Sequence, residues 1–206
     1  MSADNQHERP DSGLCQYVAG FVDGEGSFHN AVQRSEFVRV GVQVIPEFHV
    51  SQNRERASIL NLIQDVLGCG YIKANHPGNN RDRTMVLVVR NRQDLAERVV
   101  PFFERFPLRS SKQQEFQVFA AVIQAMQRGE HLTKKGMTQI LRRAFAMNGA
   151  RYRKARLQDF LAVLDSSETV CRASSRRKRR KIQSGLHGDM QRPAEMTGPP
   201  VVSSGK

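Results

Sequence analysis

Two acidic residues at the end of an apolar run are the first candidates for chemistry in this sequence. The run YVAGFVDGEG covers residues 17–26 and places Asp23 and Glu25 where its apolar part ends. If the run is a helix, both acids lie at its C-terminus, where the helix dipole is negative and an anion is unfavourable. The chain therefore places two carboxylates where they lower stability, which indicates that they have a functional role.

Small residues give the same run an unusual helix face. Gly20 and Gly24 are four residues apart and share one side, with Ala19 beside them. Each glycine costs about 1 kcal/mol relative to alanine inside a helix. Close approach by a second helix explains this cost, so we expect Ala19, Gly20, Asp23 and Gly24 to form a helix–helix interface.

Two such helix ends, side by side, would present carbonyl and carboxylate oxygens. Oxygen ligands suit hard divalent cations, and Mg²⁺ takes only one or two protein carboxylates, with water and phosphate completing its shell. Two such ions beside a phosphodiester support its hydrolysis. A calcium-binding loop starting at Asp23 is excluded, because Phe28 stands at its sixth position and Arg34 at its twelfth.

The charge of the chain indicates a polyanionic partner. Its 206 residues carry a formal net charge of +12, which favours nucleic acid or an anionic membrane surface. No apolar run reaches the roughly 18 residues of a transmembrane helix, and the polar start MSADNQHERPDSG is not a secretory signal. We expect a protein that is neither secreted nor in a membrane.

The cysteines point to the same localisation. Cys15, Cys69 and Cys171 are too few and too widely spaced for a metal motif or a disulfide framework. Free thiols indicate a reducing compartment. We therefore expect an intracellular protein, cytoplasmic in a prokaryote or within an organelle in a eukaryote.

Hydrophobic periodicity predicts an α+β fold. We expect helices at 13–24, 54–68, 93–106 and 111–129, and strands at 27–34, 39–52, 69–74 and 84–90. This α-β-β-α-β-β-α core predicts a four-stranded, mainly antiparallel sheet with helices on one face, followed by helices at 133–149 and 153–164. Pro46 predicts a bulge or an edge in the second strand, and Pro101 a bent or divided helix.

Composition divides the chain into one domain and two tails. We expect a disordered segment at 1–12, the folded domain at 13–165 and a basic, disordered tail at 166–206. The tail contains RRKRRK at 176–181. That run suits a nonspecific phosphate contact or a localisation signal, and it would also suit RNA.

Polar residues alternate along the predicted strands and would share the open face of the sheet. A sheet with a free, basic face has a shape that can bind in a groove of nucleic acid, although any one-sided antiparallel sheet carries a solvated polar face. The net charge and the acidic motif favour the nucleic-acid-binding interpretation. The candidate DNA contacts are His29, Gln33, Arg39, Gln43, His49, Lys73 and Asn75.

The nine residues VAGFVDGEG at 18–26 resemble the LAGLIDADG motif of homing endonucleases. The Ser27-Phe28 pair that follows is also usual in that family. A later stretch, EFHVSQNRERASILNLIQDVLGCGYI at 47–72, resembles the family's second strand, helix and third strand. The resemblance covers residues 14–128 and implies a site-specific, metal-dependent DNA endonuclease.

The resemblance also implies roles for the residues at the helix end. Glu25, the last acid of the motif, would bind the catalytic Mg²⁺ or Mn²⁺, the Gly24 carbonyl would reach the same ion, and Asp23 would help to close the helix end. Gln52, at the end of the second strand, would orient water. A basic residue before the fourth helix would assist near the scissile phosphate, and Lys112 is the first candidate with Arg109 as the second.

The expected reaction is hydrolysis of double-stranded DNA by a metal-activated water, without a serine, cysteine or histidine nucleophile. One copy of the motif implies a homodimer and a long pseudo-palindromic target, as in intron homing. Two alternatives on the same fold stay open: a non-cleaving DNA-binding regulator and an RNA-binding intron maturase. The sequence leaves open whether the source is an intron, an intein or a free-standing gene.

Overall fold

The computed structural model of the protein describes residues 11–79, 81–147 and 156–166. These residues all belong to one unit of the chain. The expectations for residues 1–10 and 167–206, including the basic run at 176–181 and Cys171, lie outside the described residues, and so does the start of the predicted helix at 153–164. Residues 157–166 are helical.

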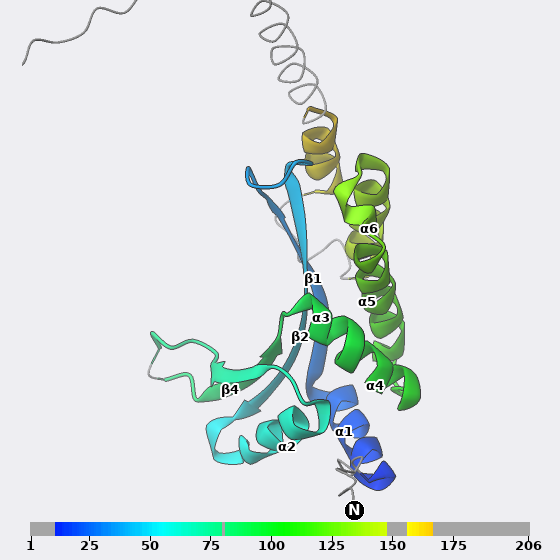
Figure 1. Ribbon diagram of the computed structural model, residues 1–206. Coiled ribbons are helices and arrows are strands. Elements are labelled where there is room, and N and C mark those ends of the chain that lie inside the picture. Colours follow the sequence, from blue (N-terminus) through cyan, green and yellow to red (C-terminus); the bar gives the residue numbers. More distant parts are fainter. Residues whose placement is uncertain (1–10, 80, 148–155, 167–206) are drawn as a thin grey trace, which may run out of the picture. The chain divides into compact units, whose positions relative to one another are not determined.

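Four antiparallel strands form the sheet, in the order β1-β2-β4-β3 (Figure 1). The strands are β1 (Gly26–Arg34), β2 (Val42–Asn53), β3 (Tyr71–Ala74) and β4 (Thr84–Val89). Two hairpins, β1–β2 and β3–β4, are joined through the pairing of β2 with β4. The predicted antiparallel sheet is confirmed.

Pro46 occupies a local edge of β2 and no bulge. Residues 42–50 of β2 pair in unbroken register with β1, and Pro46 faces Asn30. Strand β4 pairs only with residues 48–53 of β2. The side of Pro46 away from β1 therefore has no neighbouring strand, which is where the missing N–H costs nothing.

The helices follow the predicted order and cover one face of the sheet (Figure 1). They are α1 (Ser12–Glu25), α2 (Ser58–Leu67), α3 (Arg92–Asp94), α4 (Val100–Arg105), α5 (Lys112–Gln127) and α6 (Lys134–Met147). Gly68 ends α2 with a φ of 65°, a left-handed conformation that favours glycine. The α-β-β-α-β-β-α core is confirmed.

The helix at 92–105 is divided as the proline predicts. A π-helical turn at Leu95–Val99 separates α3 from α4, and the N–H of Val100 donates to the Leu95 carbonyl five residues back. Pro101 follows directly. Because proline has no N–H and its ring clashes with the carbonyl four residues earlier, the wider turn accommodates it without ending the helix.

A phenylalanine cluster fixes the start of β1 against the helices. The Phe28 ring lies with its centroid 5.1–5.4 Å from those of Phe48, Phe103, Phe116 and Phe119. Phe48 faces Phe28 across the β1–β2 pair, and the other three rings come from α4 and α5. This packing holds the α1–β1 junction next to the start of α5.

The remaining sequence expectations concern membranes and thiols. No helix in the described ranges combines the length and apolar character that crossing a bilayer requires. Cys15 and Cys69 are buried and form no disulfide within the described residues, and burial raises the pKa of the Cys69 thiol to about 11. The compartment of the protein stays a prediction.

Candidate active site at the end of α1

The α1–β1 junction places the two motif acids at an abrupt end of the helix. Asp11 caps the start of α1 by accepting hydrogen bonds from the N–H groups of Gly13 and Leu14. At the other end, a Cβ on Gly26 would lie 2.5 Å from a methyl carbon of Val22. Glycine therefore lets the chain pass from helix to strand at once, directly after Glu25.

The Asp23 carboxylate is bound by the backbone just before α5. One oxygen accepts hydrogen bonds from the N–H groups of Arg109 and Ser110, both at 2.9 Å, and the other accepts from the Ser110 hydroxyl at 2.5 Å. Burial opposes ionisation, but these hydrogen bonds outweigh it and lower the pKa of Asp23. Asp23 is therefore a charged anchor between α1 and α5.

Lys112 makes the reverse connection. Its ammonium donates to the carbonyl oxygens of Val22, at 3.0 Å, and Gly24, at 3.3 Å. Burial lowers the pKa of Lys112, and the charges of Asp23, Glu115 and Glu25 oppose that change. The last carbonyls of α1, which have no partner within the helix, thus receive a cation from the first residue of α5.

The two helix ends therefore satisfy each other. The negative end of α1 receives the Lys112 ammonium, and Asp23 receives backbone donors from the segment just before α5. This arrangement answers the question raised by an acid at a helix C-terminus, as far as Asp23 is concerned. The Arg109 contact comes from its backbone, whereas Lys112 brings its side chain to α1.

Glu25 is the motif acid that takes no part in the hydrogen bonds between the ends of α1 and α5. Its side chain is exposed, and the part of the chain that the structure describes gives its carboxylate no hydrogen bond or ion pair. Gln52 lies two residues beyond Val50, which pairs with Gly26, and is thus on the strand beside this junction. Its amide oxygen accepts from the N–H of Asn53 at 2.8 Å.

The predicted interface residues divide into two groups. Gly20 and Gly24 are exposed, and a Cβ on either would meet nothing within 4 Å. Ala19 is 5% exposed and packs mostly into the protein's own core, while Asp23 is held by the segment before α5. A groove of about 330 Å³ runs beside Ala19, Gly20 and Asp23, with residues 105–109 as its other wall.

The predicted DNA contacts are mostly on the open face. By register His29, Gln33, Gln43, His49 and Lys73 point to the side away from the helices. Their face is not wholly polar, because it also carries Val86 and Val88, which are 3% and 0% exposed.

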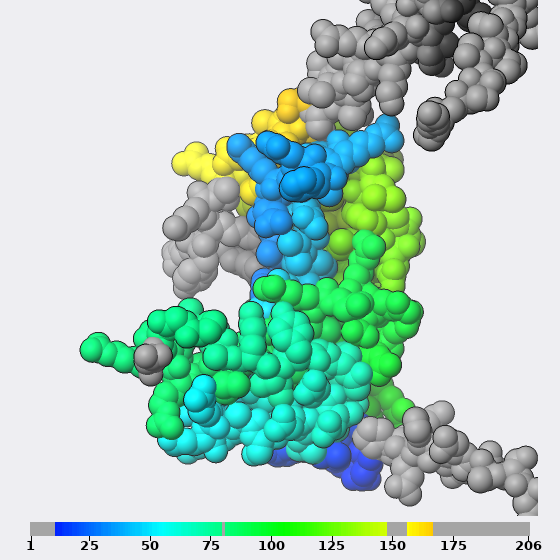
Figure 2. Space-filling view, turned by 60° about the vertical axis from the view of Figure 1, so that its left-hand side comes forward, coloured from blue at the N-terminus to red at the C-terminus, as the bar shows by residue number. Residues whose placement is uncertain are grey.

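Two of the predicted contacts lie outside the strands. Arg39 is in the turn before β2, so its placement in a strand was wrong: β2 begins only at Val42. The chain turns at 36–41, and the φ of 73° at Gly41 belongs to that turn. Asn75 follows the end of β3, and its amide lies close to His76 and Asp82. Figure 2 shows this β3–β4 connection, in teal, standing out from the sheet.

Sequence reasoning missed two contributors. Ser110 makes three hydrogen bonds at this site: its N–H and its hydroxyl donate to Asp23, and its hydroxyl oxygen accepts from the Lys112 N–H. In the sequence, only its place before a helix hinted at a cap. Glu47 is 6% exposed although it is on the open face, and lies between the side chains of His29 and His49. A buried glutamate gives no signal in a pattern of alternating polar residues.

A family model described as LAGLIDADG endonuclease matches residues 18–123. The match begins inside α1 and ends within α5, so it contains every residue of the helix-end site. The chain belongs to the LAGLIDADG endonuclease family.

Proteins named as endonucleases are similar to this chain. The DNA endonuclease I-CeuI of Chlamydomonas moewusii is 36% identical over 90 residues, which cover 44% of this chain and 40% of I-CeuI. The homing endonuclease I-ApeII of Aeropyrum pernix is 29% identical over 112 residues, or 54% of this chain and 64% of that protein. The match thus spans less than two thirds of each relative.

Solved structures agree with the fold. The homing endonuclease I-TnaI is 35% identical, with a TM-score of 0.63 over 74% of this chain and 97% of that one. The archaeal intron-encoded homing endonuclease I-Vdi141I, solved in complex with DNA, is 26% identical, with a TM-score of 0.67 over 75% of this chain and 96% of that one.

Proposed function

We propose that the protein is a site-specific DNA endonuclease that cuts both strands of a long pseudo-palindromic site as a homodimer. The observation that carries the proposal is the chemistry of the α1 end. Glu25, whose side chain is exposed, directly follows Gly24, and the Lys112 ammonium donates to the Gly24 carbonyl at the same helix end. Membership of the endonuclease family supports this reading, and so do relatives named for DNA cleavage.

The residues at this end fit a hard divalent cation. A carboxylate and a backbone carbonyl are oxygen donors, and one carboxylate is what Mg²⁺ or Mn²⁺ takes when phosphate supplies further ligands. Glu25 and Gly24 would hold it. The bound ion would supply Lewis-acid stabilisation of the scissile phosphate and a more acidic water.

The chain's own groups position the reaction. Lys112, whose burial lowers its pKa, places a positive charge where negative charge develops on the scissile phosphate. The Gln52 side chain orients water from the strand beside the junction. Asp23 keeps Lys112 and the end of α1 in place through its bonds to the start of α5.

A homodimer would complete the site. Gly20 and Gly24 leave an uncovered strip on α1, and the same strip of a second copy would bring two Glu25 carboxylates together around a twofold axis. The open faces of the two sheets would then lie on DNA. On that face, Lys73 could contact guanine, and Gln33 and Gln43 could contact adenine.

The decisive experiment replaces Glu25. Sites that wild-type protein binds are first selected from a randomised duplex library, and cleavage of the selected duplex is then followed with Mg²⁺ under single-turnover conditions. Glu25→Gln should reduce the cleavage rate by about a thousandfold or more, which is about 4 kcal/mol, with DNA binding retained. Glu97→Gln removes the same charge from the exposed surface of the 92–105 helix and should cut at the wild-type rate.

Other outcomes identify the alternatives. Wild-type protein that binds a selected duplex but cuts it with neither Mg²⁺ nor Mn²⁺ would be a DNA-binding regulator. Protein that prefers a structured intron RNA to any duplex in direct competition would be a maturase. A Glu25→Gln variant that cuts at the wild-type rate would refute the assignment of Glu25.

A further inference from the structure

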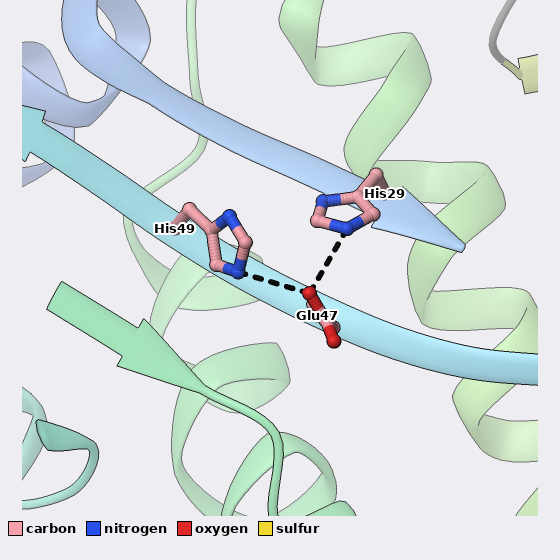
Figure 3. Close-up of side chains that lie close together, drawn as sticks. All are labelled: His29, Glu47 and His49. Carbon is pink, nitrogen blue, oxygen red and sulfur yellow. Dashed lines mark ion pairs between the residues drawn. The ribbon is translucent and has the colours of Figure 1, made fainter. Parts of the chain in front are cut away.

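Three metal-ligand side chains meet on the open face of the sheet, away from the α1 end. His29 of β1 pairs with Glu47 of β2, and His49 follows two residues along β2 on the same face (Figure 3). The Nε2 atoms of both histidines lie 3.1 Å from the same Glu47 oxygen. Four residues of extended strand separate His29 from Glu25, which is about 13 Å.

The spacing of the donor atoms suits one metal ion. The two imidazole nitrogens and the carboxylate oxygen all lie within 4.8 Å of one another. Metal–ligand bonds of about 2.0–2.2 Å place neighbouring ligands of a tetrahedral ion about 3.3–3.6 Å apart. Small rotations of the two rings, which come from adjacent strands, bring the three atoms to that spacing.

The surroundings prepare these groups as ligands. The Nε2 atom of His49 is buried and, despite its 3.1 Å distance from Glu47, makes no hydrogen bond of normal geometry within the described residues. A buried side-chain nitrogen without such a bond is unusual, and a bound metal ion would supply the missing partner.

Arg90 orients the carboxylate. Its guanidinium Nε lies 2.5 Å from the second oxygen of Glu47, so only the oxygen that faces the histidines is left for a ligand. A hydrogen-bonded partner behind a ligating carboxylate is usual in metal sites. Arg90 also balances the charge of the 6% exposed Glu47, and this ion network is the structural alternative that a test must exclude.

The donor types select the kind of ion. Two imidazoles and one carboxylate suit zinc and similar transition metals, whereas Mg²⁺ prefers oxygen. Three protein ligands leave a fourth position, and because the side chains of His29 and His49 are partly exposed, at 28% and 25%, water or a phosphate could take that position.

We propose that His29, Glu47 and His49 bind one divalent transition-metal ion of the zinc class on the open face of the sheet. The ion would link β1 to β2 and add two positive charges to this face. It is separate from the cation expected at Glu25, and the proposal does not depend on nuclease activity.

The test is direct metal binding by the full-length protein. After removal of metals with EDTA, calorimetric titration with Zn²⁺ should give one tight site per chain, and Co²⁺ should give the intense visible bands of a four-coordinate site. Excess Mg²⁺ should not compete. His49→Gln and His29→Gln should each weaken Zn²⁺ binding at least tenfold.

His76→Gln is the matched control, because His76 is an exposed histidine in the β3–β4 connection beside Asp82. It should bind Zn²⁺ as the wild type does. Circular dichroism of each variant establishes that it is folded before titration, and either histidine variant that folds is sufficient for the test. Absence of a tight site, or equal Zn²⁺ affinity in the wild type, His29→Gln and His49→Gln, would overturn the proposal in favour of a metal-free ion network.

Discussion

The α1 end and the His29–Glu47–His49 cluster are two candidate cation sites of opposite character. The helix-end site offers oxygen atoms from an exposed glutamate and a helix carbonyl, and of its two acids Glu25 is the one whose carboxylate has no hydrogen bond within the described residues. The cluster offers two nitrogens and one oxygen, all from one β-hairpin and partly buried. In the two proposals, the helix-end site would bind a hard ion and reach its full charge only with a second copy, whereas the cluster would bind a zinc-class ion within one chain.

Quaternary structure should therefore matter for the helix-end site and not for the cluster. The proposed site at the exposed strip of α1 depends on what covers that strip, because in the proposed homodimer half of its oxygens would come from the second copy. A site made from paired strands depends only on the strand register, which the core fixes on the opposite face through Phe28 and Phe48. We therefore expect substitutions in the Gly20–Gly24 strip or in the α1–α5 contact to affect cleavage without affecting Zn²⁺ binding. Substitutions in the cluster should affect Zn²⁺ binding.

The largest expected effect comes from covering the glycine strip. Gly20→Leu should abolish the dimer and lower cleavage by about a thousandfold, because the added side chain prevents close helix approach. Leucine is a better helix former than glycine, and Gly20 has open space around it within the chain, so the fold should survive. Sedimentation measures the dimer, and Zn²⁺ titration should still find one site per chain.

Gly78→Leu is the control for this change, because a Cβ at Gly78 also meets nothing within 4 Å but lies in the β3–β4 connection. It should remain a dimer. A Gly20→Leu protein that sediments as a dimer and cuts both strands would contradict the expectation that the helix-end site depends on close contact through Gly20.

An intermediate effect is expected where α5 meets α1. Lys112→Met should lower the cleavage rate by about a hundredfold, because the ammonium beside the scissile phosphate is lost. Zn²⁺ binding should not change. Lys135→Met, which removes an exposed lysine from α6, should alter the rate less than twofold. Equal rates for the two variants in single-turnover assays would exclude Lys112 from the reaction.

The smallest effect should follow loss of one hydrogen bond to Asp23. Ser110→Ala removes the hydroxyl, which donates to Asp23 and also accepts from the Lys112 N–H, but keeps both backbone donors to Asp23. We expect about 1 kcal/mol less free energy of unfolding in urea and a cleavage rate within tenfold of wild type. Ser111→Ala is the control, since Ser111 makes no side-chain capping bond at the start of α5. If both variants lose the same stability, the Asp23 contact contributes little.

Local sequence patterns were enough to predict the helices and strands and their order along the chain. Apolar periodicity, glycines after helices and the two prolines are local signals, and each located a helix, a strand or an interruption to within a few residues. The VAGFVDGEG motif also placed Glu25 at the end of a helix, because helix, glycine and acid are contiguous at 18–26.

The side chains that meet at both sites could not be predicted from local patterns, because they come from segments distant in the sequence or from paired strands. Asp23 and Ser110 are 87 positions apart, and Lys112 bonds to a carbonyl 90 positions away, so no local pattern could reveal that the ends of α1 and α5 satisfy each other. The cluster depends on the pairing of His29 with Glu47, and a change of register by one residue would send these side chains to opposite faces. Periodicity determines how a segment folds, but contacts between distant segments depend on register and core packing, which the whole chain sets together.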